Sequence, residues 1–440
     1  MKSLHLNMYK RINYITAVLV LLISFSVKAQ VTTQSPYSRY GLGNVRGSLL
    51  PQYRAMGGIS TAVYKPGPYS NINVQNPASY SGITMTTLDM GMTGSFTQLK
   101  KDGLDETSFN STLNHVALAF PVKEGKSAIS LGILPYTELG YEFSSVNSYN
   151  GVDSNKYNAL YAGEGGLTKA YIGFGQQFAG RFRVGVNVEY VFGNLQKSRS
   201  VEFLNANSFN TKVQDKNSVS GLSFSYGAQY EIPLGAKKRI TLGYSGSSPS
   251  QLNSKSTFVV TQYLRDAVGE EQSAFDTVAY NENATAKLKL PLIHNFGISI
   301  QRDNKWLLGA DYRTGQWSKL TIADANQGLE DSWGFSVGGQ YTPDLTSIGS
   351  YFKRVEYRLG FVYDKTYIRV SNTDIKQQAI TFGVGLPLAQ TSRFSFYKLN
   401  FTAELGKRGS LNNGMIQENY LNLHLGFTLN DTWFKRFKFD

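Results

Sequence analysis

Residues 421–430, LNLHLGFTLN, alternate strictly between two kinds of side chain. The apolar positions are Leu421, Leu423, Leu425, Phe427 and Leu429. Successive side chains of a β-strand point to opposite faces, so this stretch predicts a strand with one apolar and one polar face. A continuous Leu/Phe face near the end of a chain fits contact with lipid better than a soluble core. We expect the last strand of a transmembrane β-barrel here, and in its apolar residues the recognition signal for the machinery that inserts barrels.

The same period of two recurs along the chain from Ile83 onward, for example at Val116, Leu118 and Phe120. We count 14 such segments, and an even number suits a closed bacterial barrel with both termini on one side of the membrane. Tight turns alternate with long links rich in Asn and Ser, which we expect to be extracellular loops at 141–167, 197–217 and 247–284. A secreted β-sandwich also alternates in period two, but nothing would place its long loops at one end.

The composition agrees with an all-β, 14-stranded antiparallel barrel. The 440 residues include 28 Tyr, 26 Phe and 43 Gly, which supply interface girdles and positions where strands crowd. Cysteine is absent, so neither a disulfide framework nor a thiolate metal site is available. The formal net charge of +13 favours contact with anionic lipid headgroups. No cluster of Lys and Arg with interleaved aromatics occurs, so we expect no nucleic-acid partner.

The chain begins with the pattern of a secretory leader. Basic residues precede an apolar run too short to span a bilayer, and small residues follow it, so we expect residues 1–29 to be a signal peptide that exports the protein to the outer membrane of a Gram-negative cell. We assign residues 30–82 to a lead-in and plug, 83–430 to the barrel, and 431–440 to a periplasmic tail in which aromatic and basic residues alternate.

Residues 53–82, YRAMGGISTAVYKPGPYSNINVQNPASYSG, are too irregular to form a wall strand. Small residues allow close backbone packing, while Pro66 and Pro68 interrupt any helix or strand. We expect this stretch to fill the barrel lumen as a plug, with five residues forming its hatch: Gly57, Gly58, Asn76, Pro77 and Ala78.

The string RAMGG at 54–58, followed by NPA at 76–78, resembles the N-terminal hatch of the FadL/OmpP1/TodX family of outer-membrane transporters for hydrophobic compounds. Further strings resemble the branch of this family found in Bacteroidetes: LPY at 134–136, GEGGL at 163–167, GLPL at 385–388 and NDTWF at 430–434. They span nearly the whole chain after the leader. The plug is longer and richer in Pro and Tyr than is typical of the family.

The resemblance implies uptake of a hydrophobic small molecule, such as a long-chain fatty acid, through a plugged lumen with lateral release into the bilayer beside a kinked strand. Gly132 and Pro135 are our candidates for that lateral gate, because Pro removes a ladder donor. A Pro that merely bends a strand leaving the membrane is the equally simple alternative. The expected partners are outer-membrane lipid and lipopolysaccharide, the hydrophobic ligand, the barrel-insertion machinery and, in a complex, other outer-membrane proteins.

We expect no enzyme activity, no cofactor and no metal site. Residues 334–338, GFSVG, match the G-x-S-x-G pattern of hydrolases but lie within an alternating strand, whereas a nucleophile elbow needs a strand-to-helix turn. His115, His294 and His424 have no metal-ligand spacing and are more simply explained as barrel-lining or girdle residues.

A second function remains open at this stage. A barrel of this fold can instead be a non-transporting scaffold or accessory subunit of an outer-membrane protein secretion or assembly complex, because fold does not fix function. A transporter should have an apolar pocket in its lumen, whereas a scaffold can have a lumen filled by polar side chains. The inward positions of the expected strands are largely Ser, Thr, Asn and Gly, which weakly favours the scaffold. The family resemblance keeps uptake of a hydrophobic small molecule as our first interpretation.

Overall fold

The structure is a computed structural model that describes residues 35–148, 156–203, 208–266, 271–388 and 395–432. The leader expected at 1–29 and most of the tail expected at 431–440 lie outside the described residues. Within the described part of the chain, no helix is long and apolar enough to cross a membrane.

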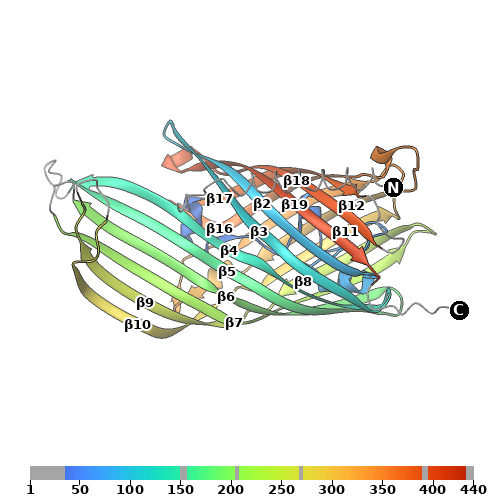
Figure 1. The fold of residues 1–440 in the computed structure, drawn as a ribbon, viewed down its shortest axis with the longest axis horizontal. Coiled ribbons are helices and arrows are strands. Elements are labelled where there is room, and N and C mark those ends of the chain that lie inside the picture. Colours follow the sequence, from blue (N-terminus) through green and yellow to red (C-terminus); the bar gives the residue numbers. More distant parts are fainter. Residues whose placement is uncertain (1–34, 149–155, 204–207, 267–270, 389–394, 433–440) are drawn as a thin grey trace, which may run out of the picture.

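The described residues are almost entirely β (Figure 1). A short N-terminal part contains η1 (Pro36–Arg39), β1 (Asn44–Val45), α2 (Pro51–Arg54) and η2 (Pro77–Gly82). The strands that follow are β2 (Thr86–Lys101), β3 (Leu104–Lys123), β4 (Ser127–Ser148), β5 (Lys156–Phe178), β6 (Phe182–Phe203), β7 (Asn210–Pro233), β8 (Lys238–Ser247), β9 (Gln251–Tyr263), β10 (Asp276–Lys289), β11 (Ile293–Arg302), β12 (Trp306–Gly315), β13 (Thr321–Ile322), β14 (Ala325–Asn326), β15 (Ser332–Tyr341), β16 (Glu356–Val370), β17 (Thr373–Pro387), β18 (Phe396–Gly409) and β19 (Gln417–Asp431).

The sheet is a closed antiparallel barrel of 14 wall strands, as the sequence predicted. Of the 19 strands, β1, β13 and β14 are two-residue pieces that do not form wall strands. Two wall strands are each broken into two pieces, β8 with β9 and β11 with β10. The last strand closes the barrel by pairing with the first, from Thr86 opposite Asp431 to Lys100 opposite Gln417.

Both breaks occur at proline. Pro249 lies between β8 and β9, and Pro291 lies between β10 and β11. Proline has no N–H to donate to a ladder, and it bends a strand where it is tolerated. The two pieces of each broken strand keep their neighbours: β8 pairs with β11, and β9 pairs with β10.

Side chains alternate between the lumen and the outside along each wall strand. On β2, Met90 and Met92 are exposed on the outer face, while Asp89 and Thr93 are buried inside. On β19, His424 and Thr428 are buried in the lumen, while the expected Leu/Phe face points outward with Leu425 exposed. The wall is therefore apolar outside and polar inside, the arrangement of a membrane barrel.

The three long links expected as loops are mostly strand, and that prediction was wrong. Residues 141–148 extend β4 and 156–167 extend β5, paired from Tyr141 opposite Gly163 to Ser148 opposite Lys156. The second link is likewise β6 paired with β7, and the third contains β9 and β10. Beyond the membrane a strand meets water on its faces, so it does not need apolar residues at every second position, and its sequence reads as a loop.

As a result, one side of the barrel is much longer than the other. In Figure 1, β4, β5, β6, β7, β9 and β10 reach farther to the left than β16–β19. The opposite end carries short turns, such as the one between Phe178 and Phe182, and the ends of the first and last wall strands.

Candidate functional site

The N-terminal segment 35–85 lies inside the barrel. The helix α2 contacts β17, β18 and β19, while η2 contacts β4, β5, β6 and β7 on the other side of the wall. Most of the segment's side chains are buried, among them Tyr53, Ile59, Ile72 and Tyr80. A segment that contacts strands all around the barrel must occupy its lumen.

Gly57 and Gly58, expected in the hatch, lie where the segment turns against the wall. Both have positive φ, 70° and 85°, which glycine adopts at little cost. A Cβ at Gly57 would lie 2.7 Å from the carbonyl oxygen of Phe361, and the Gly57 N–H donates to Thr381 Oγ1 over 2.9 Å. The backbone of the segment therefore packs directly on the backbone of the wall at this point.

Asn76, Pro77 and Ala78 form a second close contact. The Oδ1 of Asn76 accepts from the Ala78 N–H over 3.1 Å, which caps η2, and its Nδ2 donates to the carbonyl of Thr61 over 2.6 Å. The wall has glycine opposite: a Cβ at Gly185 would lie 2.3 Å from the carbonyl carbon of Pro77. The structure thus brings all five expected hatch residues into the same buried segment, at two separate wall contacts.

Asp311 of β12 holds the middle of the segment, a role that the sequence did not reveal. Its Oδ2 accepts from the backbone N–H groups of Ser60 and Thr61, each over 2.8 Å. The available signal was an acidic residue at a lumen-facing position of an alternating strand. Such a residue needs hydrogen-bond donors inside, because burying an unpaired charge is costly.

A buried ionic cluster lies on β16 and β18. Glu356 forms ion pairs with Arg358 and with Lys398, the latter over 3.2 Å. Lys398 also donates to Asn71 of the N-terminal segment over 3.2 Å, and Arg358 donates to Gln340 over 2.8 Å. All three charged side chains are almost fully buried, so the cluster binds the segment to the wall through paired charges.

Asp89 and His115 form a further buried pair, 2.6 Å apart. Thr428 donates to the other carboxylate oxygen of Asp89 over 2.8 Å. His424 contacts Thr93 over 2.8 Å. His115 and His424 therefore line the barrel interior, as the sequence suggested, and among the residues described no group of His, Cys, Asp and Glu could hold a metal.

Between these contacts lies a cavity of about 320 Å³. Its wall carries four basic and four acidic side chains: Arg46, Arg54, Lys169, Arg313, Glu189, Asp311, Asp364 and Glu404. Several are paired with one another along the wall, including Lys169 with Glu189 over 2.8 Å and Arg313 with Asp364 over 2.7 Å. Apolar side chains such as Leu49, Val74 and Val191 complete the lining. The eight charged side chains suit water and ions better than a hydrocarbon, because burying a charge against an apolar molecule is costly.

Apolar side chains fill the lumen on the long side of this cavity. Leu42 of the N-terminal segment packs with Trp317 and Leu320, which follow β12, and with Leu167 and Leu252 of the wall. Tyr37 completes this layer, and its hydroxyl donates to the carbonyl of Ile416 over 2.5 Å. Burial, with a smaller effect of Glu418, raises the pKa of Tyr37 to about 12, so the hydroxyl stays a neutral donor. The side chains of this layer are almost fully buried and fill much of the lumen at this level.

A seam in the wall lies between β3 and β4. The two strands pair from Lys123 opposite Ser127 up to Val116 opposite Ile133, and beyond that point they separate. The two residues expected at a lateral gate lie on either side of this point: Gly132 is opposite Ala117, and Pro135 begins a register shift against β5. Whether they form a gate stays a prediction.

The N-terminal segment covers the seam. Asn44 and Val45 of β1 pair with Glu138 and Thr137 of β4. The N–H of Ser35 donates to Gly140 over 3.1 Å, and that of Arg46 donates to Tyr136 over 3.0 Å.

One side chain joins both sides of the seam. Glu138 of β4 forms an ion pair with Arg46 of the segment. It also accepts from Asn110 of β3 over 2.8 Å. The exposed edge of β4 next to the seam is therefore occupied by the chain itself.

Ser336 is the central residue of the G-x-S-x-G match. It lies in the middle of β15, opposite Asp311 of β12, and faces the lumen fully buried. No strand-to-helix turn surrounds it, so the pattern lacks the structural context of a nucleophile elbow.

Comparison with known proteins agrees with this fold. The BamG family model matches residues 8–440. Among solved structures, a FadL homologue from Pseudomonas aeruginosa is 11% identical with a TM-score of 0.54, covering 89% of this chain and 100% of that one. The toluene transporter TbuX of Ralstonia pickettii is 15% identical with a TM-score of 0.54, covering 88% and 99%.

The toluene transporter TodX of Pseudomonas putida is 12% identical with a TM-score of 0.54, covering 89% and 100%. At identities this low the likeness shows a shared fold, and the ligands of those transporters cannot be assigned to this chain. No curated protein matches the chain by sequence.

Proposed function

The chain belongs to the BamG family, and from this membership and its filled lumen we propose that it is a non-transporting barrel that acts as an accessory or scaffold subunit of an outer-membrane protein secretion or assembly complex. The observation that carries the proposal is the lumen itself. It holds a charged cavity of about 320 Å³ beneath a packed apolar layer. A channel for hydrophobic molecules needs a continuous apolar path that this arrangement does not offer.

The proposal includes a location in the outer membrane. The apolar outer face of the wall and the shared fold of outer-membrane channels support this location. The long hairpins then lie at the cell surface, and the short turns and both termini lie in the periplasm. The leader expected at residues 1–29 would deliver the chain there.

Uptake of a hydrophobic compound is the second candidate, and two observations favour it. The solved structures that share the fold include toluene transporters. The seam between β3 and β4 also lies beside Gly132 and Pro135, where lateral release was expected. Against this candidate, the seam is covered by β1 and Arg46, so release would require that the N-terminal segment leave the edge of β4.

One purification separates the two candidates. The protein is extracted gently from outer membranes, its companions are identified and quantified, and bound apolar molecules are extracted for mass spectrometry. We expect a stable, stoichiometric set of outer-membrane proteins and no stoichiometric apolar ligand. A barrel that purifies alone with one fatty acid or hydrocarbon per chain would overturn the accessory role and support uptake.

A further inference from the structure

The long side of the barrel is a six-stranded sheet with two edges. Its strands, β4 through β7 with β9 and β10, stay paired beyond the ends of their neighbours: β4 pairs with β5 as far as Ser148, and β9 pairs with β10 as far as Asp276. The neighbour β3 leaves β4 at Val116, and β12 ends at Gly315. Figure 1 shows this sheet projecting to the left, with β4 at one edge and β10 at the other.

The chain itself shows how such an edge is used. The edge of β4 is covered from Tyr136 to Gly140 by strand addition, through β1 and the N–H groups of Ser35 and Arg46. Backbone hydrogen bonds of this kind are a general mode of peptide recognition. The edge of β10 has a similar cover only at its lower end, where Lys289 pairs with Thr321 and the Asp324 N–H donates to Lys287 over 3.2 Å.

Above that point the edge of β10 is free. In the described part of the chain, residues 276–286 pair with β9 alone. Alternate N–H and C=O groups of an edge strand point away from its single neighbour and can accept another strand. The stretch DTVAYNENATA contains neither proline nor lysine, the residues with which proteins commonly protect an edge.

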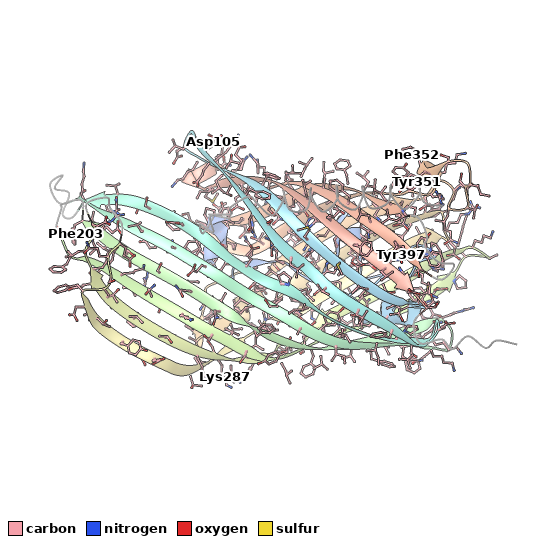
Figure 2. The ribbon with its side chains drawn as sticks, viewed as in Figure 1. Asp105, Phe203, Lys287, Tyr351, Phe352 and Tyr397 are labelled. Atoms are coloured by element: carbon pink, nitrogen blue, oxygen red, sulfur yellow. The ribbon has the colours of Figure 1, made fainter. Side chains whose placement is uncertain are left out.

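Apolar side chains are exposed at the same place. Phe275, Val278 and Tyr280 are 69%, 58% and 58% exposed, and the ring of Phe275 packs on that of Phe209 at a centroid distance of 5.0 Å. Phe203, at the tip of β6, is also exposed, and Figure 2 shows it at the far end of the sheet. These residues lie at the end of the sheet farthest from the short turns. Exposed apolar groups that gather in this way mark contact surfaces.

The site suits a short segment. Register shifts against β9 occur between Thr277 and Ala279 and between Asn281 and Ala284. Such irregularities twist an edge and limit a regular ladder to a few residues. Asp276 and Glu282 are exposed along the edge, and Lys287, labelled in Figure 2, lies at its lower end. A matching segment would carry a basic residue toward the tip, because opposite charges across a ladder stabilise it.

A second copy of this barrel does not fit the edge. Two copies in one membrane whose β10 edges face each other are related by a half-turn about the membrane normal. Barrel strands tilt by about 35–45° from the barrel axis, so the two β10 strands would cross at roughly 70–90°. Adjacent strands in a sheet are rotated relative to each other by only about 20–25°. The β10 strand of a second copy therefore does not fit as the occupant, and we take the occupant to be an extended segment of a different protein.

We propose that the free edge of β10, residues 276–286, docks a short extended segment of a partner protein at the cell-surface side by strand addition. The proposal rests on the accessory function and names where the partner contacts the barrel. The contact lies on the part of β10 above the membrane, so the strands inside the membrane keep their pairing when the partner binds.

Hydrogen exchange at the edge tests the proposal. Amide exchange of residues 276–286 is measured by mass spectrometry in outer-membrane preparations that retain the native companions, and in the barrel purified alone. We expect exchange at least ten-fold slower in the native preparation, with no change at β6. Equal exchange in both samples would overturn strand addition. Slow exchange in the purified barrel would show that the chain or a second copy covers the edge, and would overturn it as well.

Edge variants identify the contact. Ala279→Pro with Ala284→Pro interrupts the regular backbone of the edge strand, and Val278→Lys with Tyr280→Lys places charge there without changing the backbone. Ser145→Pro, on the uncovered end of β4, is the matched control. We expect both edge variants to restore fast exchange and to lose the companion that the control keeps. If companions stay with every variant, the edge proposal fails and the accessory function stands; if none accompanies the unaltered protein, the accessory function fails.

Discussion

A Cβ atom added at Gly360 would lie 2.1 Å from the backbone nitrogen of Gly57, although the two residues are far apart in sequence. The atoms that the added Cβ would meet belong to the backbone of the N-terminal segment, so no change of side-chain rotamer relieves the contact. At the scale of single residues, the N-terminal segment is held by such backbone contacts and by buried charges, and each makes a separate prediction.

Gly360→Ala should loosen the segment without disrupting the wall. Overpacking of this kind costs about 2 kcal/mol, which corresponds to a roughly 30-fold rise in the open population of the segment. Limited trypsin digestion followed by mass spectrometry should show faster cleavage after Arg46 and Arg54. Gly349→Ala is the control, because no atom lies within 4 Å of its added Cβ. Equal cleavage of the two variants would contradict the role of this contact.

In the cluster of Glu356, Arg358 and Lys398, loss of the anion should lower the stability of the barrel more than loss of one cation. Glu356→Gln leaves two buried cations without their shared anion and should destabilise the folded barrel by about 3–5 kcal/mol. Lys398→Met keeps the pair of Glu356 and Arg358 and removes the hydrogen bond to Asn71, so it should cost about 1–2 kcal/mol. Urea unfolding, followed by the gel mobility of the folded barrel, measures both. A larger loss for Lys398→Met would show that the charges are not balanced as the contacts indicate.

At the scale of elements, strand length decides where the wall is open. β4 and β10 each extend beyond the end of their pairing with a neighbouring strand. This difference creates the seam beside β3 and the free edge at the other side of the same sheet. The chain covers the first with β1 and leaves the upper part of the second unpaired within the described residues.

Glu138→Ala should open the seam. It removes the ion pair with Arg46 and the hydrogen bond from Asn110, so residues 35–46 lose side-chain contacts to both strands. We expect amide exchange of Ser35 and Arg46 to quicken roughly ten-fold, since such losses cost on the order of 1–2 kcal/mol. Glu164→Ala, which removes an exposed 3.1 Å hydrogen bond from Gln196, should leave both amides unchanged. Unchanged exchange in Glu138→Ala would mean that backbone pairing alone covers the seam.

At the scale of the whole molecule, the filled lumen predicts an electrically closed barrel. In planar bilayers the intact protein should show no steady conductance, because an apolar layer packed around Leu42 and Leu320 closes the lumen beyond the charged cavity. A variant lacking residues 35–83 should conduct, since the wall of 14 strands does not depend on that segment for closure. A steady pore in the intact protein would contradict the closed lumen and revive the transport candidate.

The sequence by itself determined the wall. Each of the 14 wall strands can be recognised in the sequence from a local alternation of apolar and polar residues. Lipid on one side of the wall and a polar interior on the other impose this alternation. The string NPA at 76–78 and the pair Gly57-Gly58 likewise predicted a compact N-terminal segment, because their conformational limits are local. The extended ends of β4 to β10 could not be recognised as strand from the sequence, since strands in water carry no such alternation.

Only the tertiary structure decided what fills the barrel. Asp311 and Ser60, or Lys398 and Asn71, meet across hundreds of residues, and pairing at such distances leaves no local pattern. The cover on the seam and the free edge of β10 depend on how far neighbouring strands extend relative to one another. These are properties of the closed sheet, in which each strand's surroundings are set by residues remote from it in sequence.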